Sequence, residues 1–131
     1  MDRITARENA MKLVYEWEMG GVGGEETESG LLDVQTDEPE RDFMRALAEG
    51  TCAHATDLDA QIAGYLRGWT IQRLSRVDLA ILRLAVYELT EVGQPAAVVI
   101  SSAVELAKRY SGEKAGALVN GVLGNLARDR A

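Results

Sequence analysis

The chain has 131 residues, of which 47% are hydrophobic and 27% charged, a composition that indicates one globular domain over residues 1–131. A single cysteine and a single histidine exclude an internal disulfide bond and the zinc sites that need several such ligands. No apolar run is long enough to span a membrane and no signal-peptide pattern is present, so we expect a soluble, cytoplasmic protein without membrane contact.

The net charge of −7 arises from one segment of the chain. Nine acidic residues and no Lys or Arg lie between Glu16 and Glu40, which leaves 14 basic and 12 acidic residues elsewhere. This small basic excess is compatible with a patch for RNA phosphates, although scattered cations are also typical of a solvated surface. The same segment is rich in glycine, so residues 20–37 are expected to form a flexible acidic connector, and its glutamates argue against a phosphate-binding loop.

Hydrophobic residues recur at helical spacing along the rest of the chain. Asp2 is a suitable N-cap for the first helix, whose apolar face carries Ala10, Val14 and Trp17. Helices are predicted over residues 2–19, 37–55, 57–67, 75–90, 96–110 and 113–128. The fold class is therefore all-α, a compact bundle of about six or seven helices.

Ser75 is an N-cap candidate, and the segment after it is apolar in nearly every direction, which predicts a central helix packed on more than one side. Its polar residues Asp78, Arg83 and Glu88 are expected to point outward, and Trp69 is expected to plug the preceding helix junction. The run 98–100 could alternatively begin a strand, but the sequence offers no convincing second strand to pair with it.

The sequence offers little for catalysis and more for binding. Cys52 and His54 are two residues apart and diverge on a helix, so we expect no enzyme activity, metal site or cofactor. On the first helix, Arg3 and Arg7 could pair with phosphates and Tyr15 could stack on a base. Arg3 and Arg7 are expected to rest their stems on the core and hold their guanidinium groups at the surface, while solvated arginines on an ordinary amphipathic helix are the alternative.

Four motifs follow one another over nearly the whole chain: Arg3-x-x-Ala6-Arg7-Glu8 with Tyr15-x-Trp17; Val77-Asp78-x-Ala80-Ile81-Leu82-Arg83-Leu84-Ala85-x-Tyr87-Glu88-Leu89; Pro95-x-x-Val98-Val99-Ile100 with Ala103-Val104-Glu105-Leu106-Ala107-Lys108; and Val119-Asn120-Gly121-Val122-Leu123. In this order they resemble the NusB family of transcription antitermination factors. The resemblance implies an all-helical fold of two packed subdomains without catalytic activity.

The resemblance also implies a function and partners. Family members bind the boxA element of ribosomal RNA leaders, pair with the small-subunit ribosomal protein NusE, and load onto the RNA polymerase elongation complex to help it resist termination. Carried over to this chain, RNA contacts are expected at Arg3, Arg7, Tyr15, Lys114 and Asn120, and partner contacts at Asp78, Leu79 and Leu82. On this basis Arg7→Ala should weaken RNA binding and leave the fold intact.

Some positions depart from the family pattern. Ile4 and Thr5 stand where members often carry further arginines, and Leu118 replaces a common phenylalanine, while Lys114 adds a cation near the last motif. These departures keep open a helical protein–protein interaction module whose partner supplies the RNA contact. A third reading, the helical accessory domain of ribosomal RNA cytosine methyltransferases, is disfavoured because 131 residues leave no room for a methyltransferase domain. The patterning does not decide between a monomer and a homodimer.

Overall fold

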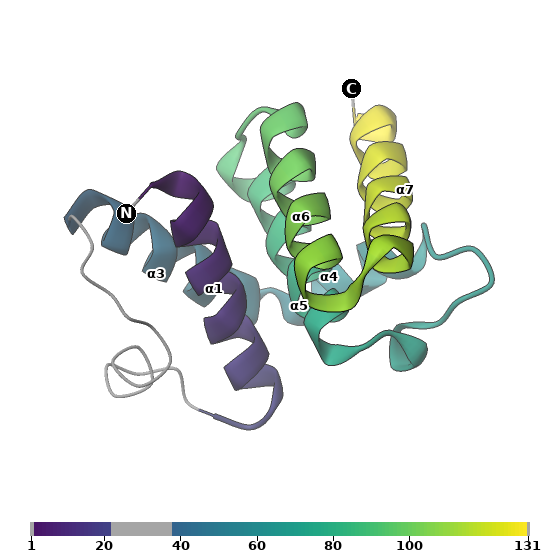
Figure 1. Ribbon diagram of the computed structural model, residues 1–131, viewed down its shortest axis with the longest axis horizontal. Helices are drawn as coiled ribbons and strands as arrows, with labels where there is room; N and C mark the ends of the chain where they lie inside the picture. Colours follow the sequence, from purple (N-terminus) through teal and green to yellow (C-terminus); the bar gives the residue numbers. More distant parts are fainter. Residues whose placement is uncertain (1, 22–37, 131) are drawn as a thin grey trace.

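Helices make up most of the chain that the structure describes. The computed structural model describes residues 2–21 and 38–130, so nearly all of the expected connector 20–37 lies outside the described residues. The elements are α1 (Arg3–Glu18), α3 (Glu38–Ala53), α4 (Ala55–Ala63), the 3₁₀ turn η1 (Ile71–Arg73), α5 (Arg76–Tyr87), the π-helical turn η2 (Glu88–Val92), α6 (Ala96–Ser111) and α7 (Glu113–Arg130) (Figure 1). These ranges contain no strand, so the all-α prediction is confirmed, and the segment that begins at Ala96 is a helix.

Two predicted helix starts are confirmed by their capping hydrogen bonds. The Asp2 side chain accepts a 2.8 Å hydrogen bond from the Thr5 backbone N–H, and Ser75 Oγ accepts one of 3.1 Å from Asp78 N–H. Such bonds satisfy amide groups that have no partner within the helix. At the other end of the chain, α6 stops at Gly112, whose φ of 105° lies in the left-handed region that favours glycine.

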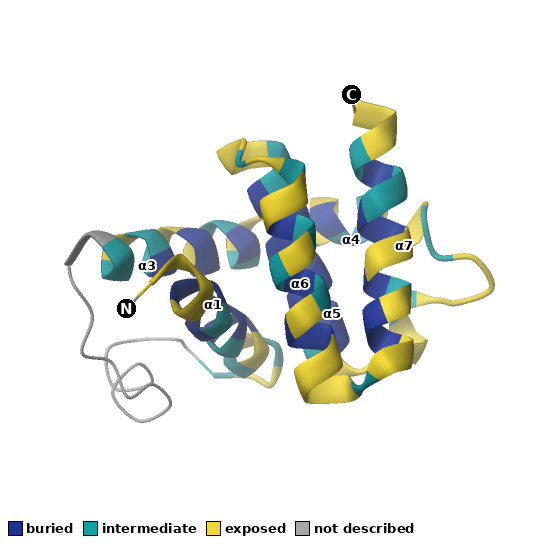
Figure 2. Cartoon of the chain, turned by 45° about the horizontal axis from the view of Figure 1, so that its top comes forward, coloured by how far each residue is buried: buried dark blue, intermediate teal, exposed yellow. Residues whose placement is uncertain are grey.

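Helix α5 is the centre of the fold, as its all-round apolar sequence predicted. It packs against α1, α3, α4, α6 and α7, and every residue from Asp78 to Val86 is buried (Figure 2). Helices α1 and α3 pack on each other on one side of α5, and α6 pairs with α7 on the other. The fold is therefore two groups of helices joined through α5.

The polar residues of α5 and the start of η2 do not point outward as the sequence suggested. Arg83 is largely buried, with its Nε and Nη2 donating to the Asp59 carboxylate at 2.7 and 2.6 Å and its Nη1 donating to Glu18 at 3.0 Å. Asp78 and Glu88 are also buried. A long polar side chain can enter a core when a partner satisfies it, and a pattern of hydrophobicity does not reveal that partner.

One guanidinium therefore serves two carboxylates, that of Glu18 at the end of α1 and that of Asp59 in α4. The Glu18 side chain is almost completely buried, and its Oε2 has no hydrogen-bond partner among the described residues. Burial raises the pKa of the Glu18 carboxyl from 4.5 to about 7, although the nearby Arg83 guanidinium opposes this shift. Among the described acidic groups, Glu18 is therefore the one whose ionisation most clearly destabilises the folded state.

The two tryptophans are more exposed than the sequence pattern indicated. Trp69 is 49% exposed and does not plug the junction after α4, because its ring lies beside Arg73 at the surface, 5.5 Å from the guanidinium carbon. Trp17, expected on the apolar face of α1, is 37% exposed and lies 6.0 Å from the Arg83 guanidinium carbon. Both indole rings contact a cation instead of filling the core.

Gly50 of α3 faces the Tyr87 ring of α5, and this close approach gives a stability prediction. A Cβ on Gly50 would lie 2.2 Å from Tyr87 Cζ, whereas a Cβ on Gly124 of α7 would meet nothing within 4 Å. We expect Gly50→Ala to lower the free energy of unfolding by about 1–2 kcal/mol through this overlap. The matched variant Gly124→Ala should raise it by about 0.5–1 kcal/mol, since alanine favours a helix. Urea denaturation measures both, and equal stabilisation by the two variants would contradict the close α3–α5 contact.

Candidate nucleic-acid interface

Arg7 is part of the core and not of the surface. Its side chain is 5% exposed and that of Glu88 2%, and the guanidinium donates to the Glu88 carboxylate through Nε at 2.9 and 3.0 Å and through Nη2 at 2.7 Å. The expectation that Arg7 holds its guanidinium at the surface is wrong. The pair instead fastens α1 to η2, because a two-pronged guanidinium–carboxylate contact holds both groups in one geometry.

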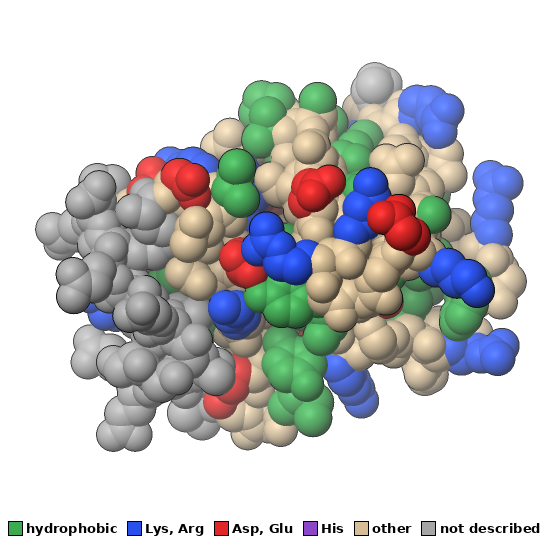
Figure 3. Space-filling model, in the orientation of Figure 1, with side chains coloured by type: hydrophobic (Ala, Val, Ile, Leu, Met, Phe, Trp, Pro, Cys, Tyr) green, Lys and Arg blue, Asp and Glu red, His purple; other side chains and the backbone are tan. Residues whose placement is uncertain are grey.

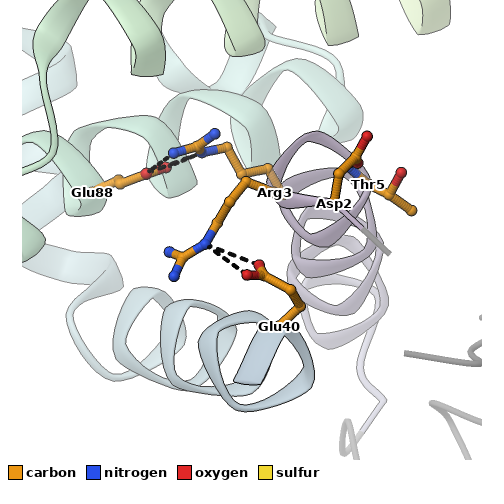
Figure 4. Close-up of polar contacts among 6 residues, drawn as sticks. Asp2, Arg3, Thr5, Glu40 and Glu88 are labelled. Carbon is orange, nitrogen blue, oxygen red and sulfur yellow. Dashed lines mark hydrogen bonds and ion pairs between the residues drawn. The ribbon is translucent and has the colours of Figure 1, made fainter. Parts of the chain in front are cut away.

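Arg3 does lie at the surface, but it also has an acidic partner. Its Nε lies 3.2 and 2.9 Å from the two Glu40 carboxylate oxygens (Figure 4). Its guanidinium carbon lies 3.7 Å from the centre of the Phe43 ring. A phosphate that binds Arg3 would therefore compete with Glu40. An exposed ion pair of this kind is weak enough to be exchanged.

Glu8, the residue after Arg7, joins α1 to α6. Glu8 Oε2 accepts hydrogen bonds from the Tyr110 hydroxyl at 2.5 Å and from Arg109 Nη1 at 3.0 Å. Farther along α1, Tyr15 is partly exposed, as stacking on a base would need. The adjacent Arg7 and Glu8 thus hold α1 against two different elements and leave Tyr15 at the surface.

Helix α7 carries the other two expected RNA-binding residues. Lys114 and Asn120 are both exposed, while Leu118 between them is half-buried. Helix α6 lies between α1 and α7 in the bundle (Figure 1), so the structure does not gather the expected RNA-binding residues into one cluster. An RNA that contacts all of them would have to cross the face of α6.

Lys114 lies at a cavity with one of the expected partner residues. The cavity has a volume of about 530 Å³, and Trp69, Arg73, Asp78 and Lys114 contribute to its wall. Lys114 comes from α7, Asp78 from α5, and the other two from the segment before α5. The structure therefore brings together residues that the sequence assigned to two different partners.

The other two expected partner residues are not at the surface. Leu79 is 2% exposed and Leu82 is fully buried, so neither side chain offers a contact surface. The expectation for these two leucines is wrong because α5 is covered on all sides, and its apolar residues are used in packing.

Sequence reasoning missed the contact between Trp69 and Arg73 at this cavity. Their spacing of four residues is an available signal, because it suits a cation–aromatic contact in a helical turn. That signal remained weak since a tryptophan near a helix junction is usually part of the core. Only the fold shows that this ring is exposed beside a cavity.

Basic side chains do not form a continuous patch on the face that Figure 3 shows. Asp and Glu side chains lie among them, and the basic ones are closest together toward α7 and the segment that joins α4 to α5. The cavity at Lys114 is bordered by these same two parts of the chain. This end of the molecule is therefore the better location for an anionic ligand.

The two residues considered for catalysis, Cys52 and His54, differ in exposure. Burial raises the pKa of the half-buried Cys52 thiol to about 11, so the thiol is protonated near neutral pH. His54 is exposed, with Nδ1 2.8 Å from the Gly50 carbonyl oxygen. Among the described residues, no group of three His, Cys, Asp or Glu side chains could hold a metal ion, and no helix is long and apolar enough to cross a membrane.

Comparison with known proteins places the chain in a family. The model of the NusB family matches residues 4–128. The chain belongs to the NusB family. The transcription antitermination protein NusB of Acetivibrio thermocellus is 39% identical over 130 residues, which cover 98% of this chain and 90% of that relative. The family predicted from the four motifs is thereby confirmed.

Solved structures of NusB proteins support the same assignment. NusB from T. maritima aligns with a TM-score of 0.87 and 32% identity, covering 98% of this chain and 92% of that one. A chain in a crystal structure of the antitermination factors NusB and NusE in complex with double-stranded RNA aligns with a TM-score of 0.84 and 29% identity, covering 98% and 99%. The likeness extends over both groups of helices around α5.

Proposed function

We propose that this chain is an RNA-binding antitermination factor that works together with the ribosomal protein NusE. The observation that carries the proposal is its likeness, over 98% of its length, to a chain in the NusB–NusE–RNA complex. By the family resemblance, the RNA is the boxA element of ribosomal RNA operons. The assembled pair would load onto the RNA polymerase elongation complex and help it resist termination.

The RNA contacts that we propose use Arg3 and Tyr15 of α1 with Lys114 and Asn120 of α7. All four are wholly or partly exposed, and they combine two cations, a ring that can stack and an amide. Arg7 supports this surface from inside by fixing α1 through Glu88. Its part in RNA binding is therefore indirect.

A second candidate function has an observation of its own. Arg7 is buried in an ion pair and Arg3 is shared with Glu40, so α1 offers RNA less free positive charge than its sequence implies. This favours a helical protein–protein interaction module whose RNA contact is supplied by its partner. The two functions differ in whether the chain binds RNA on its own.

A fluorescence anisotropy titration separates these functions. Labelled boxA RNA and a scrambled RNA would each be titrated with the protein, with and without NusE, at two salt concentrations. Selective binding that tightens with NusE is expected. Selective binding only when NusE is present would support the interaction module, and no selective binding in any condition would refute both.

Replacing Lys114 tests the assignment of α7. Lys114→Gln should weaken boxA binding and reduce the slope of log K against log salt by about one, because roughly one phosphate contact is lost. Arg128→Gln is the matched control, since it removes an exposed cation from the far end of the same helix. Equal weakening by both variants would show that α7 contributes only general charge.

A further inference from the structure

The aromatic ring of Phe43 on α3 lies beside both arginines of the first α1 motif. The Arg3 guanidinium carbon is 3.7 Å from the ring centre, and that of Arg7 is 5.7 Å from it. Both distances are within the range of a cation–π contact, and the shorter one brings the Arg3 group into van der Waals contact with the ring face. Because α1 and α3 pack on each other, the ring is held at a fixed place next to the start of α1.

The two guanidinium groups differ in what they can offer to RNA. The Arg7 side chain is 5% exposed and is held by the Glu88 carboxylate. The Arg3 side chain is 46% exposed, and its partner Glu40 forms a surface pair that a phosphate can displace. Of the two arginines beside Phe43, only Arg3 can therefore reach an RNA phosphate.

The contacts of Arg3 leave hydrogen-bond donors for a phosphate. These donors lie in the plane of the guanidinium, so a ring against its flat face occupies none of them. Glu40 contacts Nε, and Figure 4 shows the two terminal nitrogens of Arg3 pointing away from that carboxylate. A phosphate that takes the place of Glu40 can therefore bind while the guanidinium stays on the Phe43 ring.

We propose that Phe43 is a positioning residue for the RNA contact of Arg3. The inference rests on the RNA-binding function proposed above. A flexible arginine loses conformational entropy when a phosphate fixes it. The Phe43 ring holds the guanidinium at one place in the free protein, so less entropy is lost when RNA binds. Phe43 thereby strengthens RNA binding without carrying a charge.

The two neighbours of Arg3 on α3 should have opposite effects on RNA binding. Phe43→Leu removes the ring and keeps an apolar side chain, so boxA RNA should bind about threefold more weakly in the presence of NusE. Phe43→Tyr keeps the ring and should restore the wild-type affinity. Glu40→Gln removes the competing charge and should strengthen binding about twofold. Urea denaturation shows whether each variant remains folded.

Fluorination of the ring separates positioning from packing. Phe43 is the only phenylalanine in the chain, so fluorinated phenylalanine supplied to an auxotrophic host changes this position alone. Fluorine withdraws negative charge from the ring face and changes the ring shape little. RNA affinity should therefore fall stepwise through the mono-, di- and trifluorinated ring. In the monofluorinated protein, the single fluorine NMR signal should shift in the Arg3→Gln variant and on addition of boxA RNA.

Paired changes identify the residue through which Phe43 acts. In the Arg3→Gln background the trifluorinated ring should lower the RNA affinity no further, because the group that it positions is gone. Lys114→Gln is the matched control, since it removes the expected cation contact on α7 and leaves Arg3 in place. In that background the trifluorinated ring should weaken binding by the same factor as in the wild type.

The outcomes separate this inference from the proposed function. An equal effect of ring fluorination with and without Arg3 would overturn the positioning role and leave the function standing. Selective boxA binding that neither ring fluorination nor Arg3→Gln weakens would overturn it as well. Absence of selective RNA binding under every condition would remove both the inference and the function.

Discussion

Replacing Arg7 with methionine is expected to lower the free energy of unfolding by about 4 kcal/mol, because the change leaves the buried Glu88 carboxylate without its partner. Methionine keeps much of the volume of the side chain, so lost packing contributes little. Urea denaturation followed by circular dichroism measures the effect. A loss of this size is a large part of the total stability of a domain, so the variant would be partly unfolded on mild heating.

Two further variants identify the cause of that loss. Arg7→Met combined with Glu88→Leu removes both charges and should return to within about 1 kcal/mol of the wild type. Arg3→Met breaks the exposed pair with Glu40 on the same helix and should cost no more than about 1 kcal/mol. If the single Arg7 variant is as stable as the Arg3 variant, the Arg7–Glu88 pair does not hold α1 in place. From the sequence, Arg7→Ala was expected to weaken RNA binding and leave the fold intact. From the structure, we expect the same variant to weaken the packing of α1 itself.

The second large effect concerns the pH dependence of stability through Glu18. The pKa of this carboxyl is about 7 in the folded protein, against 4.5 for an ordinary glutamate. Its ionisation therefore costs the folded state progressively as pH rises from 4.5, and the cost is complete above pH 7. Glu18→Gln should raise the free energy of unfolding by about 2 kcal/mol at pH 8 and leave it nearly unchanged at pH 5.

The measurement is a pair of urea denaturation series at pH 5 and pH 8. The informative quantity is the difference between variant and wild type, because all other titrating groups are common to both. Glu105→Gln, an exposed change on α6, should give no difference at either pH. Equal destabilisation of Glu18→Gln at both pH values would mean that its contact with Arg83 outweighs the cost of burying its charge.

Local sequence was sufficient for the helices and several of their ends. Asp2 and Ser75 cap the helices that they were expected to cap, because an N-cap interaction involves residues only three apart. Apolar spacing also identified α5 as central, since a helix without a polar face must be covered on all sides. The family could also be assigned from the sequence, because its motifs are recognised from the linear order of their residues alone.

The candidate site could be predicted only in part. Lys114 and Asn120 are exposed as an RNA contact requires, but Leu79 and Leu82 proved to be core residues. An amphipathic pattern reveals which face of a helix is buried. The sequence of α5 is apolar on nearly every face, so it does not show which of its residues contact a partner. The cavity at Asp78 and Trp69 was not predicted, because its wall is built from three separate parts of the chain.

The sequence by itself determined the helical class, the order of the helices and the family, all of which depend on residues close together or on a fixed linear order. The tertiary structure decided which charged groups face water. Arg7 meets Glu88 across 81 positions and Arg83 meets Glu18 across 65, and these contacts turn apparent surface charges into buried ion pairs. The physical reason is that burying a charge is costly unless an opposite charge lies beside it, and packing between distant segments fixes where such partners lie.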